Sequence, residues 1–474
     1  MHHHTLFFYD LETSGLQPRE ARIMQFAGQR TTLDLEPLGS PVNLLVKITN
    51  DTLPSPSAIN VTRITPQSTL LDGINEAEFC RYVTDKVFTP GTVSLGYNTV
   101  RFDDEFMRAT FWRNFYDPYE WQWQNDRSRW DLLDVVRLTR ALRPEGIKWP
   151  FRKDGVPTNR LELITKLNGV KHEHAHDALS DVYATIAVAR LIREHQPDLY
   201  QYLFKMRDKR QIKSLVNLDH PQPFVYASGR YSNKFNKATV VFPISPSRNG
   251  NVLVYDLRHN LDEVLSARAE LSAKSPSASS AQASPDDPCE HPPRIRQSMS
   301  FFPIVKELCY NKCPAVAPLG VLNKNSGWDK LSLTPELIKA NLNTLLSHQE
   351  FIKQISTAAE FQPTFPPATE PETALYDSFV PKADLSTVAA VRNADTDRLR
   401  DFHPRFKDNR LPELLLHYKG RNFPESLSES EASVYETYRR SRLENQVPTF
   451  LAELDQITDS FLKEELLLYL QSLQ

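Results

Sequence analysis

Apolar residues in the first part of the chain, to about residue 190, switch between short strand-like runs and the wider spacing typical of helices. The short runs predict strands at residues 6–9, 23–30, 43–48 and 93–97. The wider spacing predicts helices at residues 131–142, 160–167 and 177–195. Strands that alternate with helices in this way indicate an α/β domain with a mixed sheet.

The pattern changes after about residue 200, where short β-like runs such as PFVYASGRYS and NVLVYDL predict a small β-rich module. Residues 272–293 are rich in Ser, Ala and Pro and almost lack bulky apolar side chains, so we expect a mobile loop there. A Pro-rich linker at 361–373 precedes a remainder with helical spacing, most clearly at 411–424 and 460–473. We therefore expect three regions.

The charge and cysteine content exclude some broad classes of protein. The chain has 56 Lys and Arg against 59 Asp and Glu, so it is not a globally basic protein that coats nucleic acid. The four cysteines do not make a disulfide framework in so long a chain, and Cys309 and Cys313 have no second Cys or His pair nearby to complete a zinc site. We find neither a membrane-spanning apolar run nor a signal peptide, and expect a soluble, cytoplasmic protein.

Two carboxylates one residue apart end the first predicted strand, in the stretch FFYDLETSG. Because side chains alternate faces along a strand, Asp10 and Glu12 point the same way. Adjacent like charges raise each other's pKa unless a positive group lies between them. The carboxyl ends of strands in open α/β sheets commonly bind ligands, but a pair of solvated edge acids fits these two residues equally well.

Two later stretches supply further acids and a histidine. VSLGYN followed by TVRFDDEF places Asp103 and Asp104 just beyond a predicted strand. HEHAHDALSDVYATIAVARL places His176 and Asp181 around the start of an apolar helix. Five residues are about 140° out of phase on a helix, so both can face one ligand only if His176 lies in the entry loop and Asp181 on an early turn.

These residue types together indicate metal-assisted phosphoryl chemistry. Three or four carboxylates that converge from strand ends and a helix suit hard divalent cations, which prefer oxygen ligands. Two such ions about 4 Å apart can clamp an in-line phosphoryl displacement. A nearby histidine can take the proton from the attacking water near neutral pH.

The order of the motifs, D-x-E, then an Asp after YNTVRF, then H-x4-D, resembles the His-containing branch of the DEDD exonuclease superfamily. Longer stretches, among them YNTVRFDDE, RNFYDPY, SRWDLLDV, AHDALSDVYATIA, NKCP and RNFP, resemble bacterial exonuclease I across nearly the whole chain. The resemblance implies an α/β ribonuclease-H-like exonuclease domain at 1–195, a β-rich SH3-like domain at 196–362 and an α-helical C-terminal domain at 363–474. It also implies a monomeric 3′→5′ exonuclease that degrades single-stranded DNA to 5′-mononucleotides, in DNA repair and recombination, with two Mg²⁺ ions that Mn²⁺ can replace.

The same resemblance assigns the metal ligands. Asp10, Glu12 and Asp181 match family ligands, with Asp10 expected to bridge the two ions. Asp103 matches the acid that holds the second ion, directly or through water, because it follows the Phe that the family places there. Asp104 stays open as an alternative to Asp103.

His176 matches the general base and completes the catalytic set with the four acids. Glu12 is also expected to contact substrate. Arg160, in TNRLELITK, matches a family arginine that contacts substrate, and a guanidinium suits a phosphate oxygen. For any single acid or histidine the alternative is a surface residue or a helix cap.

Residues 101–130 hold ten aromatic side chains, a third of the window against 10% in the whole chain, with arginines between them. Aromatic faces stack on unpaired bases and arginines follow phosphates, although most rings in such a window belong to the core. Arg108, Trp112 and Trp123 are the residues that we expect to contact DNA, because they follow Asp103 among polar neighbours. Residues 201–240 hold eight Lys or Arg against two Asp, which indicates either an extension of the DNA path or a solvated face.

The resemblance further implies binding of the acidic, Phe-ending tail of single-stranded-DNA-binding protein, for which Arg143 and Tyr202 match family positions. The stretch after NKCP diverges from the family, which leaves the rest of that site unassigned. Two other functions stay open: a nuclease that trims RNA ends, and a non-catalytic single-strand-binding protein that keeps the fold. The two extra domains argue against the first, and the intact metal set argues against the second.

Overall fold

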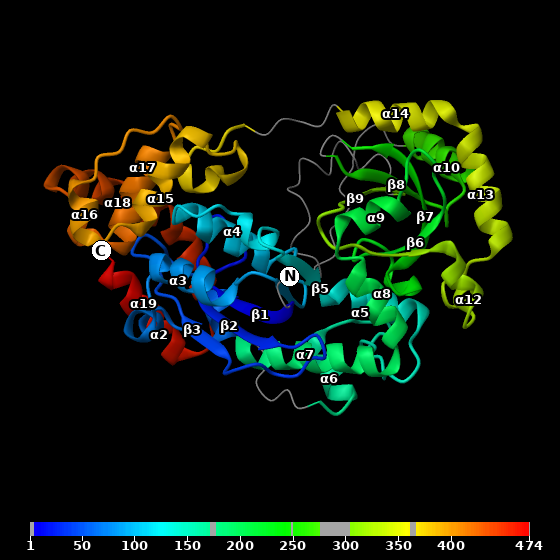
Figure 1. Ribbon diagram of the computed structural model, residues 1–474, viewed down its shortest axis with the longest axis horizontal. Helices are drawn as coiled ribbons and strands as arrows, with labels where there is room; N and C mark the ends of the chain where they lie inside the picture. The colour runs from blue at the N-terminus through cyan, green and yellow to red at the C-terminus, as the bar shows by residue number, and fades with distance from the viewer. Residues whose placement is uncertain (1–3, 171–176, 248–249, 275–303, 361–365, 474) are drawn as a thin grey trace. The chain divides into compact units, whose positions relative to one another are not determined.

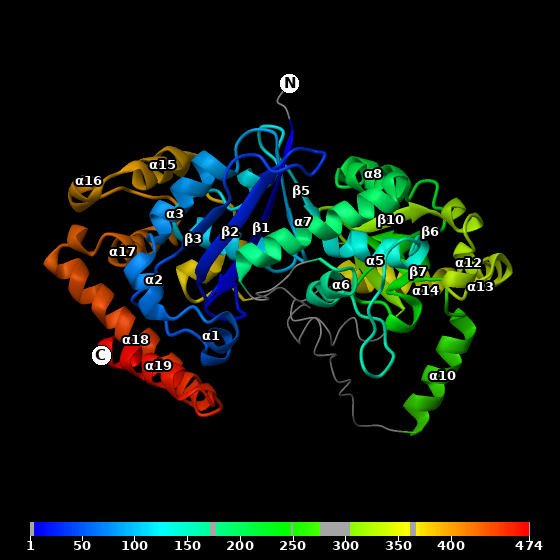
Figure 2. The ribbon, with the colours of Figure 1, turned by 90° about the horizontal axis from the view of Figure 1, so that it is seen from below.

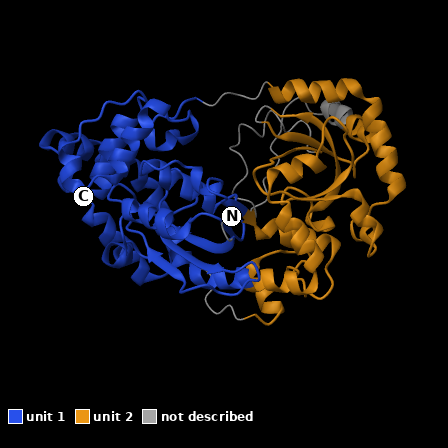
Figure 3. Cartoon of the chain, in the orientation of Figure 1, with its two compact units in different colours: residues 1–129, 172–186, 366–474 blue, residues 130–171, 187–365 orange. Residues whose placement is uncertain are grey.

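The structure is a computed structural model that describes residues 4–170, 177–247, 250–274, 304–360 and 366–473. The chain forms two compact units (Figure 3), unit 1 from residues 1–129, 172–186 and 366–474, and unit 2 from residues 130–171 and 187–365. Two of the boundaries between their segments fall inside elements, one in β5 (Ser128–Asp131) and one in α7 (Ala178–His195). The loop expected at 272–293 lies outside the described residues from position 275 onward, and its first three residues belong to helix α10.

A five-stranded sheet with the order β3-β2-β1-β4-β5 carries unit 1 (Figure 1). In addition to β5, its strands are β1 (Thr5–Thr13), β2 (Ile23–Thr31), β3 (Val42–Leu45) and β4 (Thr92–Gly96). β2 is antiparallel to β1 and β3, whereas β4 is parallel to β1, so the sheet is mixed as predicted. The strand expected at 43–48 ends earlier, because Val46 forms an isolated bridge with Ile74 instead.

Because side chains alternate along β1, one face of the strand packs in the core and the other carries the two acids. Phe7, Tyr9 and Leu11 belong to one core cluster with the helices α3 (Glu76–Tyr82), η1 (Val83–Val87) and α4 (Asp103–Arg113). Asp10 and Glu12 therefore lie on the opposite face of the strand. In Figure 2 the first turns of α7 cross this part of the sheet beside β1 and β2.

Helices from the two ends of the sequence pack together in unit 1. The early helices are α1 (Pro56–Thr62), α2 (Pro66–Asp72), α3, α4 and η2 (Glu120–Gln122). The late ones are η5 (Pro371–Tyr376), η6 (Lys382–Asp384), α15 (Leu385–Asn393), α16 (Thr396–Asp401), α17 (Leu411–Asn422), η7 (Pro424–Ser426), α18 (Glu429–Leu454) and α19 (Ser460–Ser472). One buried cluster joins Met24, Ile48 and Ile59 to Leu443, Phe450 and Leu466.

A buried ion network also joins the early and late segments of unit 1. Arg22 contacts Asp51 at 3.7 Å and Glu372 at 3.4 Å. Arg421 contacts Asp51 at 2.6 Å, and Arg442 contacts Glu372 at 2.6 Å. Burial by itself would raise the pKa of Glu372, but these arginines outweigh burial and lower its pKa to about 2.

Unit 2 is built on a second five-stranded sheet, with the order β10-β6-β7-β8-β9. Its strands are β6 (Phe224–Ala227), β7 (Ala238–Pro246), β8 (Val252–Asp256), β9 (Val305–Leu308) and β10 (Ala315–Pro318). Its helices are α5 (Leu132–Leu142), α6 (Leu161–Leu167), α8 (Pro197–Lys205), α9 (Lys209–Leu215), η3 (Asn233–Phe235), α10 (Leu261–Lys274), η4 (Leu319–Asn323), α12 (Gly327–Lys330), α13 (Pro335–Ser347) and α14 (Gln349–Glu360). The second sheet, β6 to β10, is the β-rich module predicted after residue 200. Over the described ranges, the helices are all too short or too polar to cross a membrane.

Candidate active site

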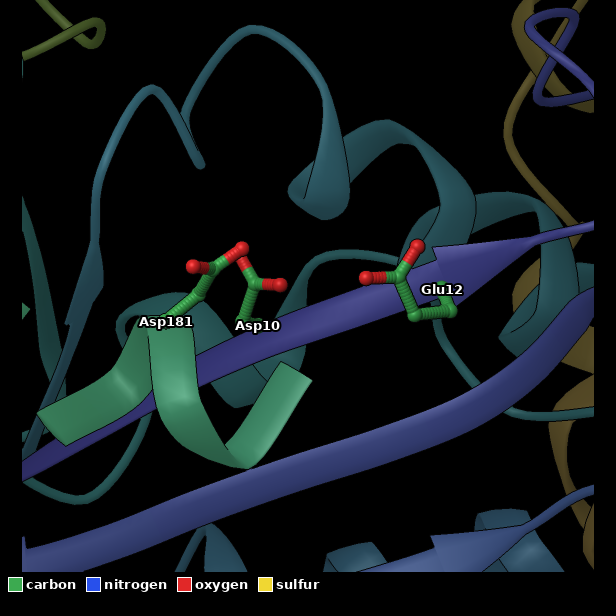
Figure 4. A group of neighbouring side chains, drawn as sticks. All are labelled: Asp10, Glu12 and Asp181. Atoms are coloured by element: carbon green, nitrogen blue, oxygen red, sulfur yellow. The ribbon is translucent and has the colours of Figure 1, made fainter. Parts of the chain in front are cut away.

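Three carboxylates meet on the α7 side of β1. Asp10 and Glu12 come from the strand and Asp181 from the first turn of α7, and each offers an oxygen within 4.8 Å of the others (Figure 4). The strand period places the first two on one face, and the early position in the helix brings the third to them. The structure thus brings together three of the acids that the sequence singled out.

The electrostatics of this group favour a bound cation. Burial raises the pKa of Asp10 well above its usual range, and the charges of Asp103, Asp181 and Asp177 raise it further. Burial, followed by the charges of Asp10 and Asp181, raises the pKa of Glu12 to about 9. Carboxylates held this close repel one another unless positive charge lies among them. Oxygen ligands in this number and spacing fit a divalent cation such as Mg²⁺ or Mn²⁺.

Asp103 lies at the first position of α4 and is buried. The pairing of β1 with β4 ends at Phe8 and Leu95, so the following part of β1 is available to other groups on that side. There the backbone N–H of Leu11 donates to Oδ1 of Asp103 at 3.1 Å. Asp103 is thereby held against β1 at Leu11, the residue between the two acids of the D-x-E motif.

Asp104 has different partners from its neighbour, although both are buried. The Tyr9 hydroxyl donates to Oδ1 of Asp104, and the Arg129 guanidinium forms an ion pair with Oδ2. Burial and the charges of Asp104 and Asp103 raise the pKa of Tyr9, which keeps the hydroxyl a donor. Both oxygens of Asp104 are thus engaged within the protein, a geometry that favours Asp103 as the acid near the metal.

His176 lies outside the described residues, but the next residue is described. Asp177 accepts from the backbone N–H of Ser180 at 3.2 Å, which caps α7, and from Nε2 of Gln25 at 3.4 Å. Gln25 is the cross-strand partner of Glu12 and also donates to Asn43 at 2.9 Å. The sequence had suggested Asp177 as a helix cap, which the bond from Ser180 confirms, but Gln25 was missed, and its signal was a single amide within the apolar run IMQFA.

The predicted DNA-contacting residues of unit 1 divide into one exposed and two buried side chains. Trp123 is 64% exposed, so its ring is available for stacking. Arg108 is buried, donates to Glu105 at 2.6 Å and to Gln122 at 2.9 Å, and is therefore held mostly within the protein.

Trp112 departs from the expectation. It is only 3% exposed and its indole N–H donates to the carbonyl of Pro371 at 2.8 Å, while the Arg410 guanidinium lies 4.7 Å from its ring centroid. Trp112 thus packs against the C-terminal segment of unit 1, and its ring is closed to a DNA base.

The remaining predicted residues belong to unit 2. Arg160 is exposed at the residue before α6. Arg143 follows α5 and donates to the carbonyls of Leu142 at 2.7 Å and Val321 at 3.2 Å. Tyr202, on α8, is half-buried against the core of the second sheet, and burial raises its pKa to about 12.

Three family models match the chain in succession. Residues 7–189 match the model described as Exonuclease, residues 207–283 the Exonuclease I SH3-like domain, and residues 369–474 the Exonuclease I C-terminal domain. The class of protein that the fold and the carboxylate site define is therefore an exonuclease with a ribonuclease-H-like domain, and the predicted fold class is confirmed. The predicted domain boundaries at 195 and 362 stay predictions.

Similarity to individual proteins narrows the class further. The chain is 37% identical to exodeoxyribonuclease I of Haemophilus influenzae over 96% of this chain and 94% of that one, and 37% identical to that of Escherichia coli over 92% and 89%. A crystal structure of E. coli exonuclease I with a dA16 oligonucleotide matches with a TM-score of 0.88 at 34% identity, over 99% of this chain and 100% of that one. An exonuclease I from Methylocaldum szegediense matches with a TM-score of 0.86 at 36% identity, over 99% of each chain. The chain belongs to the exodeoxyribonuclease I family, as its motifs indicated.

Proposed function

We propose that this chain is a 3′→5′ exonuclease that degrades single-stranded DNA to 5′-mononucleotides by two-metal-ion hydrolysis and serves DNA repair and recombination. The observation that carries the proposal is the cluster of Asp10, Glu12 and Asp181, with Asp103 held against the same strand. Exonuclease I of E. coli has been crystallised with dA16 and dT13 oligonucleotides, which supports single-stranded DNA as the substrate class.

In this proposal Asp10, Glu12 and Asp181 would hold one Mg²⁺ ion, and Asp10 with Asp103, directly or through water, would hold the second. Bound Mg²⁺ would neutralise charge on the scissile phosphate and lower the pKa of a water molecule. Mn²⁺ prefers similar oxygen ligands and can replace Mg²⁺. Since one chain supplies all four acids, the proposed site is complete in a monomer.

The other residues bind substrate and move the proton. His176 accepts the proton of the attacking water, since imidazole is the side chain that titrates near neutral pH. Glu12 also contacts the terminal nucleotide, and Arg160 pairs with a phosphate oxygen. Trp123 stacks on an unpaired base. The guanidinium of the buried Arg108 lies 5.4 Å from the centroid of the Tyr119 ring.

We also propose that unit 2 binds the C-terminal tail of single-stranded-DNA-binding protein. That tail is acidic and ends in Phe, so it needs a cation beside an apolar surface. Arg143 can supply the cation and Tyr202 the apolar surface. Both belong to unit 2 and neither is fully buried.

The test is the cleavage of a single-stranded DNA oligomer labelled at its 5′ end, in the presence of Mg²⁺. We expect a ladder that shortens from the 3′ end with wild-type protein. Asp181→Ala and an excess of EDTA should each lower the rate by at least about 10³-fold. Asp198→Asn is the matched control, because Asp198 also lies in the first turn of a helix but is exposed on α8. It should cleave at the wild-type rate.

Each alternative function predicts a different result in the same assay. Binding of the oligomer without shortening, equal in wild type and Asp181→Ala, would leave a binding protein that keeps the fold. Shortening of an RNA oligomer but not of DNA would support a nuclease that trims RNA ends. Immediate release of the label as a mononucleotide, without a ladder, would contradict the proposed polarity.

A further inference from the structure

We propose that Arg129, acting through Asp104, is a positioning residue for the metal site: it holds the first turn of α4 so that Asp103 stays beside Asp10. This inference rests on the proposed function, since it concerns the geometry of that reaction. Neither Arg129 nor Asp104 touches the reacting atoms in this proposal. Their role is to fix the position of Asp103, the residue next to Asp104.

The first turn of α4 is attached to β1 at two points, one on each side of Asp10. The backbone N–H of Leu11 donates to Asp103 at 3.1 Å. The Tyr9 hydroxyl donates to Asp104. Because Tyr9 and Leu11 flank Asp10 in the sequence, these two bonds determine where Asp103 lies relative to Asp10.

Arg129 forms an ion pair with Asp104 in this buried position and balances its charge. The side chains of Asp104 and Arg129 are 3% and 8% exposed, and the guanidinium contacts the carboxylate oxygen that Tyr9 leaves available. A buried carboxylate that loses its counter-ion is strongly unfavourable and moves toward water. This movement would break the Tyr9 bond and displace the turn that carries Asp103.

The sheet explains why Arg129 is suited to this task. Arg129 lies on β5, at the end of the order β3-β2-β1-β4-β5, and Tyr9 lies on β1 with β4 between them. Asp104 therefore connects two strands of the sheet to the helix that carries Asp103. Displacement of a catalytic group by about 1 Å can cost up to about 10²-fold in rate, so the precision of this connection matters for the reaction.

The experiment compares R129M, D104N, the double variant R129M/D104N and D103N with wild type. Three quantities are measured: kcat and KM on single-stranded DNA, the melting temperature without metal, and its increase on addition of Mn²⁺ without DNA. R30M is the matched control, because Arg30 lies on the same sheet but donates to Thr5, Thr92 and the carbonyl of Val87 at the other end of β1. R30M should change kcat by less than about 2-fold, even if it lowers the melting temperature.

We expect R129M to lower kcat by about 10- to 100-fold while KM stays within about 2-fold, as for residues that orient a metal ligand. R129M/D104N should recover at least about 5-fold in kcat over R129M, because the unpaired carboxylate is removed with its partner. R129K, which keeps the charge on a shorter side chain, should lie between wild type and R129M. D104N should keep most of the Mn²⁺-induced increase in melting temperature, whereas D103N should lose most of it.

Two results would overturn the proposal. A D104N variant that loses the Mn²⁺ effect as completely as D103N would make Asp104 a metal ligand. An R129M variant whose kcat falls no more than that of R30M, at equal loss of melting temperature, would leave Arg129 with a structural role alone. Failure of the wild type to cleave DNA would contradict the proposed function instead, and the Mn²⁺ measurements would still distinguish Asp103 from Asp104.

Discussion

Asp10 on β1 and Asp181 in the first turn of α7 bring carboxylate oxygens within 4.8 Å of one another, with Glu12 as the third member of the group. Groups of like charge at this distance oppose folding when nothing positive lies among them. The metal-free protein therefore retains unfavourable repulsion among these three carboxylates. The proposed ions would relieve it, which makes the site measurable by stability as well as by activity.

Glu12→Gln should raise the free energy of unfolding of the metal-free protein by about 1–3 kcal/mol near neutral pH. The pKa of Glu12 is raised to about 9 in the folded state, so the unfolded chain releases this proton at a lower pH than the folded chain. The wild type should therefore lose stability as pH rises from about 5 to about 9, and the Gln variant should lose less. Urea unfolding in EDTA at several pH values measures both effects.

Addition of Mg²⁺ should reverse the order of the two proteins. The wild type gains stability from the ion at Asp10, Glu12 and Asp181, whereas the Gln variant has lost one ligand and gains less. A wild type whose stability rises with pH in EDTA would contradict the electrostatic account of this site.

Glu372→Gln should lower the free energy of unfolding by about 3–5 kcal/mol, because it leaves Asp51 as the one buried carboxylate that Arg421 and Arg442 must share. The pKa of Glu372 is lowered to about 2, so its contribution is present above the unfolded value of about 4.5 and is lost as pH falls toward 2. The difference between wild type and variant, measured by urea unfolding, should shrink over that acid range.

Glu370 gives the matched control for this effect. It also contacts Arg442, at 2.8 Å, but its side chain is 41% exposed. Glu370→Gln should cost no more than about 1 kcal/mol, as is usual for exposed ion pairs. Equal losses for the two variants would mean that burial does not decide the strength of this network.

Trp123→Ala should weaken binding of single-stranded DNA by about 5- to 100-fold, equivalent to about 1–3 kcal/mol for one stacked base, without a change in melting temperature. Trp112→Ala should instead lower the free energy of unfolding by about 3–5 kcal/mol, because it empties a site packed against Pro371 and Arg410. Fluorescence anisotropy of a labelled oligomer in EDTA measures binding without cleavage. The reverse pattern would place Trp112, not Trp123, on the DNA path.

The contrast between these two tryptophans shows where sequence reasoning stops. Both lie in one window of aromatic and arginine residues, and both satisfy the same rule for stacking on bases. Trp112 is buried because it packs against the segment that begins at Pro371, which is remote in the sequence from α4. Local composition carries no information about such a partner. The same holds for Arg22, whose buried partners include Glu372.

Arg143→Ala and Tyr202→Ala should each weaken binding of an acidic peptide that ends in Phe by about 5- to 50-fold. Arg143→Ala removes the positive charge that pairs with the acidic peptide. Tyr202→Ala removes the apolar surface beside it. Isothermal titration with this peptide, and with a version that lacks the final Phe, separates the two contributions. DNA cleavage without the peptide should stay close to the wild-type rate in both variants, and normal peptide binding by both would place the tail elsewhere.

The periodicity of strands and helices predicted where the acids lie more reliably than which residues contact them. The two-residue period of a strand placed Asp10 and Glu12 on one face, and the helical pattern put Asp181 near the start of α7. The choice between Asp103 and Asp104 could not be made in the same way, because adjacent residues of one type differ only in what they contact. Tyr9 and Arg129 make that distinction, and neither belongs to a motif that marks it as functional.

The discontinuity of unit 1 has a consequence for the protein during its synthesis. Met24 and Ile59 leave the ribosome before unit 2 is made, yet they pack against Phe450 and Leu466, which are translated only after all of unit 2. A nascent chain that stops before α18 already contains the four acids of the proposed metal site but lacks part of the core beneath their sheet. The core of this sheet is therefore complete only after α18 and α19 have been translated, and we expect a chain that stops before them to be a target for proteolysis and not a truncated nuclease.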